Sequence, residues 1–424
     1  MLRLVAAAVA AALLPPLTAT AGAAGFAPPD APGPPLSVSA TDLAKVLDCS
    51  AGIDGAVRAP VLLFQGTGAT AKDNWSWTYS PAFDQAGIPW CTVDLPDHAT
   101  SDIQRSGEYV VAAIRAVHSR AGRKVSLVGH SQGGMVGRWA LRFWPDTRAM
   151  VDDVIGFAPS NHGTTEADCS SGCSAAGWQQ SDEANFIRAV NSSQETFPGI
   201  SYTVAYTRTD ETVKPNMDAT GSSSLRGGGG RIANVAIQDI CPDDVNEHLA
   251  IGTIDPVAHA LAIDALDHDG PADPARVDRL VCARPFHPGV NPATFPADAA
   301  AAVASFESYQ ARQIGAEPPL ACYTTASCPA GAGAGAPAPP AAGRACASKR
   351  RFAVHLPRRV RRARATVDGR RLKLRRRGGR LTATVDLRGR RKATVVLRVR
   401  GRTRSGKRVK YTRRYHPCST RRAR

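Results

Sequence analysis

A glycine-flanked serine lies between an apolar run and a segment of helical periodicity. The pentapeptide GHSQG at residues 129–133 follows the apolar run 125–128 and opens the segment 133–143. A sharp strand-to-helix turn leaves no room for a Cβ beside its central residue, and it lifts that residue's hydroxyl clear of the sheet. This placement predicts that Ser131 is a nucleophile rather than a serine in an ordinary turn. Its neighbour His130 is expected to point elsewhere on the turn.

A serine hydroxyl is a weak nucleophile near neutral pH, so it needs a histidine to remove its proton and an acid to orient that histidine. For a serine on a strand-to-helix turn, the expected chain order is serine, acid, histidine. Asp210 follows the apolar run 202–206, where a strand would end, and we predict that it is the acid. Asp239, Asp243 and Asp244 are its rivals.

Several histidines follow the predicted acid in the chain, and His248 is the best placed of them to act as the base. It stands just ahead of residues 249–266, which are apolar at helical spacing, so a loop before that helix would aim the imidazole at the nucleophile. His259 lies inside the same segment, and His268 and His287 lie in polar or proline-rich loops. The sequence therefore favours His248 and leaves these alternatives open.

The negative charge that develops on a substrate oxygen needs hydrogen-bond donors. The backbone N–H of Gln132, next to the nucleophile, is one predicted donor. A second is expected from the glycine-bounded loop 66–68, where Thr67 also carries a hydroxyl. The loop lacks the lysine and the spacing of a phosphate-binding P-loop, which argues against nucleotide binding.

These residues need a scaffold, and the pattern of apolar residues predicts one. Strands are predicted at residues 61–64, 88–93, 125–128, 154–157 and 202–206, and helices at 103–118, 133–143 and 249–266. Strands that alternate with helices predict the α/β class, with a mostly parallel sheet covered by helices on both faces.

The pattern changes after residue 328. The stretch PAGAGAGAPAPPAAG at 329–343 is typical of a semi-stiff linker. Beyond it, apolar and polar residues alternate at 381–387 and 393–399, and the pairs Asp368-Gly369 and Gly378-Gly379 sit where hairpin turns are expected. The sequence thus predicts a small antiparallel β domain at the C-terminus.

Charge divides the 424-residue chain in the same place. The formal charge is +17, yet residues 344–424 hold 32 Lys and Arg against only two acidic residues, so the preceding part is acidic. The length allows two or three domains and excludes a mini-protein. The basic region is either a solvated face or an attachment to an anionic surface, such as cell wall, acidic polysaccharide, lipid headgroups or nucleic acid, or to the chain's own acidic part. The scarcity of aromatic residues there disfavours single-stranded nucleic acid.

The N-terminus and the cysteines predict the compartment. Residues 1–24 combine Arg3, a short apolar run and small residues around Ala23, as in a secretory signal peptide that is too short to span a membrane. An even set of ten cysteines without metal-site spacing favours disulfides in an oxidising compartment. Connectivity does not follow from sequence, and our hypothesis pairs neighbours in chain order. These are Cys49 with Cys91, Cys169 with Cys173, Cys241 with Cys282, Cys322 with Cys328 and Cys346 with Cys418.

A series of motifs in one order resembles the Candida antarctica lipase B family of α/β-hydrolase serine lipases over residues 45–285. The motifs are LLFQGTG at 62–68, SQGG at 131–134, FAP at 157–159 with GT at 163–164, WQQ at 178–180 and TDETV at 209–213. The resemblance implies Ser131 as nucleophile, Asp210 as acid and His248 as base, with Thr67 and Gln132 forming the oxyanion hole. It also implies two disulfides, Cys49–Cys91 and Cys241–Cys282.

Two departures limit what the resemblance implies. The family's nucleophile turn often lacks a first glycine, which this chain has at Gly129. The stretch DCSSGC at 168–173 replaces the segment where the family carries a short mobile helix beside the pocket mouth. If its two cysteines pair, that rim is small and tethered, so acyl-chain preference and lid motion do not carry over.

We therefore expect a signal peptide at 1–24, an α/β-hydrolase lipase domain at 25–328, a linker at 329–343 and a basic β domain at 344–424. The predicted function is a secreted, monomeric serine lipase or carboxylesterase that forms an acyl-enzyme and needs no metal or other cofactor. The expected partners are an ester or lipid substrate and an anionic cell-envelope or polysaccharide surface, with no specific nucleic acid. The alternatives are an acyltransferase or polyester depolymerase with the same triad, or a non-catalytic protein that binds anionic surfaces.

Overall fold

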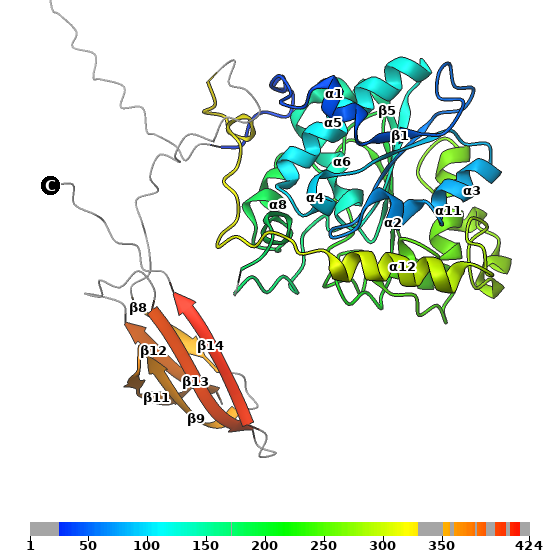
Figure 1. Ribbon diagram of the computed structural model, residues 1–424. Coiled ribbons are helices and arrows are strands. Elements are labelled where there is room, and N and C mark those ends of the chain that lie inside the picture. Colours follow the sequence, from blue (N-terminus) through cyan, green and yellow to red (C-terminus); the bar gives the residue numbers. More distant parts are fainter. Residues whose placement is uncertain are drawn as a thin grey trace, which may run out of the picture. The chain divides into compact units, whose positions relative to one another are not determined.

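The chain divides into two compact units in the computed structural model (Figure 1). One unit comprises Ala24–Pro339, and the other includes Pro340–Arg424. The structure describes residues 25–170, 172–329, 351–356, 360–377, 380–386, 395–403 and 408–415. The predicted signal peptide, nearly all of the predicted linker, and Cys346 and Cys418 lie outside the described residues.

A seven-stranded sheet forms the centre of the first unit, in the order β1-β3-β2-β4-β5-β6-β7. Its strands are β1 (Leu47–Cys49), β2 (Val61–Phe64), β3 (Trp90–Val93), β4 (Val125–His130), β5 (Val151–Phe157), β6 (Ser201–Tyr206) and β7 (Arg231–Ala236). Only β1 runs antiparallel to its neighbour, while the other pairs are parallel. The carboxyl ends of β2, β4, β6 and β7 therefore meet at one edge, where α/β folds bind ligands.

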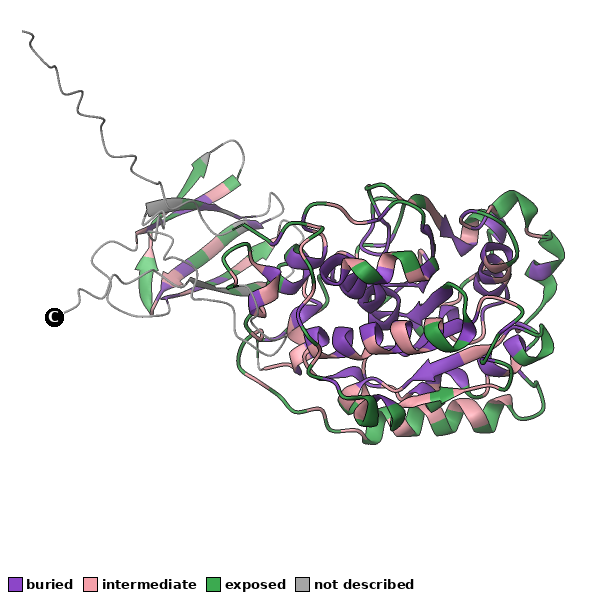
Figure 2. Cartoon of the chain, turned by 90° about the horizontal axis from the view of Figure 1, so that it is seen from above, coloured by how far each residue is buried: buried purple, intermediate pink, exposed green. Residues whose placement is uncertain are grey.

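Helices cover both faces of this sheet because successive strand residues point to opposite sides. Leu62 and Phe64 pack into one core and Val61 and Leu63 into the other. The helices are α1 (Ala40–Ala44), α2 (Ala71–Trp75), α3 (Tyr79–Gln85), α4 (Pro96–Ala99), α5 (Ile103–Ala121), α6 (Gln132–Phe143), α7 (Ala175–Gln179), α8 (Asn185–Val190), α9 (Ile237–Ile240), α10 (His248–Ile251), α11 (Pro256–Asp267) and α12 (Phe295–Ser308). Figure 2 shows buried residues concentrated on the strands and exposed residues on the outer sides of the helices. The α/β class with a mostly parallel sheet covered on both faces, which the alternation predicted, is confirmed.

The prediction of one helix over 249–266 was wrong. The structure has two helices, α10 and α11, and the chain restarts between them because the side chain of Asp255 caps α11 by accepting from Ala258 N–H and Pro256 occupies its first position. By length and composition alone, His248–Asp267 would be apolar enough to cross a membrane. Of this stretch 61% is buried, as expected for core helices of a folded protein.

The second unit contains two antiparallel sheets, as the alternating pattern predicted. One sheet has the order β10-β9-β13-β14 and the other β11-β12-β8. The strands are β8 (Arg351–His355), β9 (Val360–Val367), β10 (Arg370–Leu372), β11 (Leu374–Arg377), β12 (Arg380–Asp386), β13 (Val395–Thr403) and β14 (Arg408–Tyr415). Asp368 and Gly369 form the predicted turn between β9 and β10, both with positive φ, as a tight hairpin requires. The predicted turn at Gly378-Gly379 lies outside the described residues.

Four disulfides join cysteines that are neighbours in the chain order. They are Cys49–Cys91, Cys169–Cys173, Cys241–Cys282 and Cys322–Cys328. The first links the antiparallel edge strand β1 to β3, where the two cysteines face each other in register. The described part of the chain contains no free cysteine.

Candidate active site

The turn between β4 and α6 holds Ser131 in a strained backbone conformation. Its φ of 54° and ψ of −123° lie in a region that a non-glycine residue rarely adopts. Two bare glycines make the turn possible, since a Cβ on Gly129 would lie 2.2 Å from the carbonyl of Gly133, and one on Gly133 would lie 2.0 Å from the Phe64 oxygen. The turn therefore presents the serine at the carboxyl edge of the sheet, as the motif predicted.

His248 and Asp210 form a buried pair at the same edge. Asp210 follows β6 and His248 begins α10 beyond β7, and His248 Nδ1 lies 3.1 Å from Asp210 Oδ2. The carboxylate also accepts the backbone N–H groups of Thr212 at 2.9 Å and Val213 at 2.7 Å through Oδ1. Burial raises the pKa of Asp210, but its bond to His248, the charge of that histidine and the two backbone bonds outweigh burial and lower the pKa overall. Asp210 is therefore ionised at neutral pH.

Acidic neighbours fix the backbone of His248. Glu247 caps the short helix α10 by accepting the N–H groups of Leu249 and Ala250, and Glu211 accepts the N–H of His248 at 3.2 Å. The chain on either side of the imidazole is thus held before any substrate is present.

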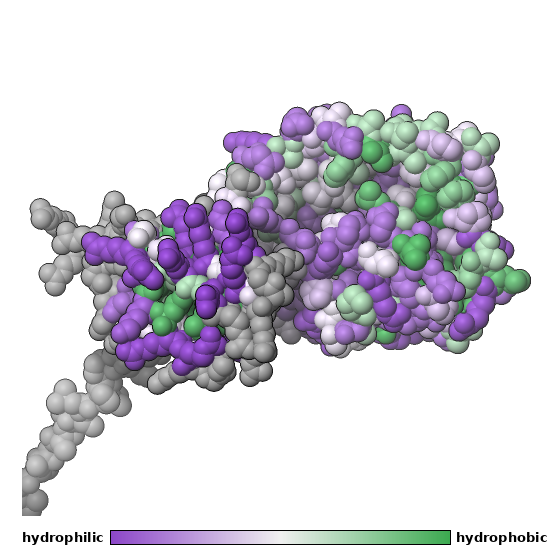
Figure 3. Space-filling view, turned by 90° about the horizontal axis from the view of Figure 1, so that it is seen from below, coloured by the Kyte–Doolittle hydropathy of each residue, from purple (hydrophilic) through white to green (hydrophobic). Residues whose placement is uncertain are grey.

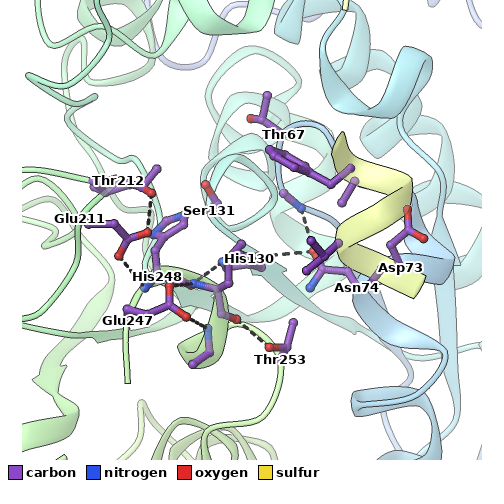
Figure 4. A pocket seen from close by; sticks show the side chains of 18 of the residues that line it. Thr67, Asp73, Asn74, His130, Ser131, Glu211, Thr212, Glu247, His248 and Thr253 are labelled. Carbon is purple, nitrogen blue, oxygen red and sulfur yellow. Dashed lines mark hydrogen bonds between the residues drawn. The ribbon is translucent and has the colours of Figure 1, made fainter. Parts of the chain in front are cut away.

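Ser131 and His248 line one cavity of about 870 Å³ and lie near each other in its wall (Figure 4). Ser131 Oγ forms no hydrogen bond within the described residues, so the structure brings the serine and the imidazole to the same site without a direct bond. Bonds between nucleophile and base are often long in the absence of substrate and tighten on binding.

The residues predicted to stabilise an oxyanion lie around the same serine. Gln132 is the first residue of α6, so its N–H has no partner within the helix. Thr67 lies on the loop after β2, and its hydroxyl accepts a bond of 2.8 Å from the side chain of Gln180. The side chain of Gln132 donates to Ala99 O at 2.9 Å, and Gly68 N–H donates to His98 O at 2.7 Å, so the turn that contains α4 supports both donors.

Comparison with known proteins identifies relatives with this arrangement of elements. No protein-family model matches the chain. Lipase B of Pseudozyma antarctica is 31% identical over 219 residues, which make up 50% of this chain and 63% of that lipase. The chain thus spans about three-fifths of the length of that relative. The crystal structure of Aspergillus fumigatus lipase B is similar with a TM-score of 0.64 and 28% identity, covering 69% of this chain and 74% of the other.

This chain is similar to lipase B over half of its length. The resemblance stated from the motifs and the predicted fold class are both confirmed by these relatives. In the described ranges, no group of three or more His, Cys, Asp or Glu side chains is arranged to hold a metal ion.

The structure contains a feature that sequence reasoning missed, a network of hydrogen bonds made by His130 and Asn74. Its Nε2 lies 2.9 Å from the carbonyl oxygen of His248, and its Nδ1 lies 3.3 Å from Asn74 Oδ1. The same Asn74 oxygen accepts the Gly66 N–H at 3.0 Å, and the Asn74 amide donates to Gly252 O at 3.3 Å. One histidine and one asparagine therefore join the nucleophile turn, the oxyanion loop and the loop of the base (Figure 4).

Burial keeps the His130 ring neutral. Desolvation, with the adjacent charge of His248, lowers its pKa to about 3. The proton belongs on Nε2, because a carbonyl only accepts and the 2.9 Å contact is the shorter of the two, so the contact of Nδ1 with the Asn74 oxygen is not a hydrogen bond. The ring fits against a bare backbone, since a Cβ on Gly252 would lie 2.1 Å from His130 Cδ2. His130 thus points away from the serine, as expected, but it contacts the backbone of the base.

The rival acids and histidines of this chain lie elsewhere in its structure. Asp239 pairs with Arg208 on the surface. Asp244 accepts the N–H of Asn246 at 2.8 Å and does not contact a histidine. His259 and His287 stack at 4.8 Å in a buried cluster with Tyr79. Neither Asp239 nor His259 lines the cavity, whereas Ser131 and His248 do.

An exposed helix supplies much of the apolar wall. Helix α12 contributes Phe295, Val303 and Phe306 to the cavity lining, although none of its residues is buried. Phe306 also packs on the oxyanion loop, where a Cβ on Gly68 would lie 2.4 Å from the ring. The Cys169–Cys173 disulfide closes a loop of a few residues beside the cavity residues Glu166 and Ala167.

Proposed function

We propose that this protein is a serine lipase or carboxylesterase that hydrolyses carboxylic esters of acylglycerol type through an acyl-enzyme. The observation that carries the proposal is that Ser131, on its strained turn, and His248, which is bonded to the buried Asp210, line one cavity. The lipases to which the chain is similar support the same class of reaction.

In the proposed reaction, Ser131 Oγ attacks the ester carbonyl carbon while His248 Nε2 takes its proton. Asp210, ionised and bonded to His248 Nδ1, keeps the other proton on Nδ1 and so leaves Nε2 free to accept. The carbonyl oxygen becomes an oxyanion, and the N–H groups of Gln132 and Thr67 would stabilise it.

The C–O bond of the ester then breaks, and the alcohol leaves with the proton held by His248. The acyl group remains on Ser131. Water, deprotonated by the same imidazole, attacks the acyl carbon and releases the acid, which restores the free serine. Each step uses side chains of this chain, and the apolar wall from α12 suits an acyl chain.

We also propose that the protein works outside the cytosol. Four disulfides in the described part of the chain fit an oxidising compartment. The N-terminal leader that would direct export lies outside the described residues.

Replacement of the nucleophile tests the reaction. Ser131→Ala is expected to abolish hydrolysis of p-nitrophenyl acyl esters and labelling by a fluorophosphonate probe, with an unchanged circular dichroism spectrum. Esters of rising chain length would define acyl preference, and an alcohol in competition with water would separate hydrolysis from acyl transfer. Hydrolysis by the folded mutant at the wild-type rate would refute the proposal.

A further inference from the structure

The four-stranded sheet of the C-terminal unit carries rows of cations on its outer face. In the antiparallel register, Arg400 lies opposite Arg364 on one side and Lys410 on the other. Two residues along β13, Arg402 lies opposite Arg362 and Arg408 in the same way. Paired residues of adjacent antiparallel strands point to the same face, so six cations form two adjacent rows.

The opposite face of this sheet is committed to the core. Val395, Leu397 and Val399 of β13 are buried, and Ala365 and Val367 of β9 pack with them. A strand alternates its side chains between faces, so burial of these residues forces the intervening arginines outward. The rows are therefore a fixed consequence of the hairpin register and do not depend on side-chain flexibility.

The row of Arg364, Arg400 and Lys410 carries like charges without an acidic neighbour among the described residues. Across strands the cations are about 5 Å apart at the Cβ level, a spacing at which like charges are destabilising. Within the described part of this unit the acidic residues are Asp368, at the β9–β10 turn, and Asp386, on β12 of the other sheet. Arg364, Arg400 and Lys410 have no ion pair or hydrogen bond to described side chains and are exposed. An external anion would relieve this repulsion.

The surroundings of the rows indicate which anion fits. The next row along β13 places Thr366 and Thr412 on either side of Arg398, so hydroxyls accompany the cations. No aromatic or large apolar residue occupies these rows, which leaves nothing for stacking on bases or for insertion into a bilayer. Hydrophilic side chains predominate in the part of this unit that Figure 3 shows.

Exposed cations also lie on the other sheet of the same unit, at Arg375 and Arg380, and at Lys373 just before β11. A flat bilayer could meet only one of the two sheets, whereas a polymer mesh can surround the unit. Guanidinium groups bind carboxylates through two parallel hydrogen bonds, and same-face residues on a strand recur about every 7 Å, so the rows present a grid to an extended polyanion. We propose that this face binds an acidic polysaccharide, with arginine on its carboxylates and threonine on its hydroxyls.

Binding of the full chain to polygalacturonate tests the proposal, with neutral dextran as the reference polymer. The row variant carries Arg364→Thr, Arg400→Thr and Lys410→Thr, because threonine already occupies this face. The matched control carries Lys373→Thr, Arg375→Thr and Arg380→Thr, which remove the same charge from positions outside the rows. We expect the wild type to bind at low salt and to dissociate as salt rises, since counterion release dominates such contacts.

The row variant is expected to bind at least about tenfold more weakly, and the control within about threefold of the wild type, because among the described strands only the rows align three cations side by side. Equal weakening of both variants would overturn the proposal, since net charge alone would then explain binding. Absence of wild-type binding at low salt would also overturn it. So would tighter binding to anionic phospholipid vesicles or duplex DNA at matched charge. The salt titration and these competitions use the unaltered chain, so they remain decisive if a variant misfolds.

Discussion

Replacement of Asp210 by Asn should remove most of the catalytic rate while leaving the site in place. Asp210 Oδ1 accepts two backbone N–H groups, from Thr212 and Val213, so the oxygen of an asparagine amide must occupy that position. Its NH2 group then takes the place of Oδ2 and faces His248 Nδ1. A donor at this position forces the histidine proton onto Nε2, where the imidazole can no longer accept from Ser131.

The same exchange in a Ser-His-Asp triad lowers kcat about 10⁴-fold, which corresponds to about 5.5 kcal/mol of lost transition-state stabilisation. We expect a loss of that order here, because the surrounding bonds dictate the amide orientation. The assay is kcat for p-nitrophenyl ester hydrolysis near neutral pH. KM is expected to change little, since Asp210 does not line the cavity and the asparagine oxygen keeps the bonds to the Thr212 and Val213 N–H groups.

Asp239→Asn is the matched control, because that carboxylate pairs with Arg208 on the surface, outside the cavity. Its kcat should stay within about threefold of the wild type, as surface substitutions usually have small effects. A kcat for Asp210→Asn within tenfold of the wild type, in a folded protein, would refute the tautomer argument and the assignment of the acid.

Three further predictions follow from other parts of the site and core. Gly252→Ala should displace the His130 ring, because its Cβ would overlap the ring. Like His130→Ala, it should lower kcat at least about tenfold with little change in KM, since each variant disturbs the buried bond to the carbonyl oxygen of His248. Steady-state kinetics showing a changed KM alone would contradict this. Phe306→Ser should raise KM for long-chain esters and leave acetate hydrolysis near wild type, since the ring lines the cavity; equal effects on both chain lengths would exclude the acyl-wall role. Burial, which outweighs the bond from Ser126, raises the pKa of Asp153 from its ordinary value of 3.8 to about 7. Between these two pH values the folded protein keeps a proton on Asp153 that the unfolded chain has already released. Asp153 thus costs stability increasingly as pH rises from 3.8 through 7, and denaturant unfolding should find Asp153→Asn more stable than wild type at pH 8 with the gain shrinking towards pH 4.

Local chemistry explains why the turn at Ser131 was predictable. The turn around Ser131 depends on glycines next to the serine in sequence, and the strands 61–64 and 202–206 are short apolar runs that match the structure within a residue. Edge strand β1 and strand β7 were missed because their residues are half-exposed and carry little apolar signal. The break before α11 was missed although Asp255 and Pro256 are a recognisable helix start.

The roles of other residues depend on contacts between distant segments. His130, at the end of β4, and Asn74, on the helix α2 that follows β2, meet only because β2 and β4 are neighbours in the parallel sheet. Helix α12 has no buried residue, so its amino acids gave no core signal, yet it forms one wall of the cavity. Neither relation has a spacing rule in the sequence.

By itself, the sequence determined the α/β class, the turn at Ser131 and the separate basic region, because these depend on residues that are adjacent or periodic along the chain. The tertiary structure alone decided which acid holds His248, what His130 contacts and how the arginines of β9, β13 and β14 align. Those outcomes depend on strand register and loop packing, in which a shift of one residue turns a side chain to the opposite face.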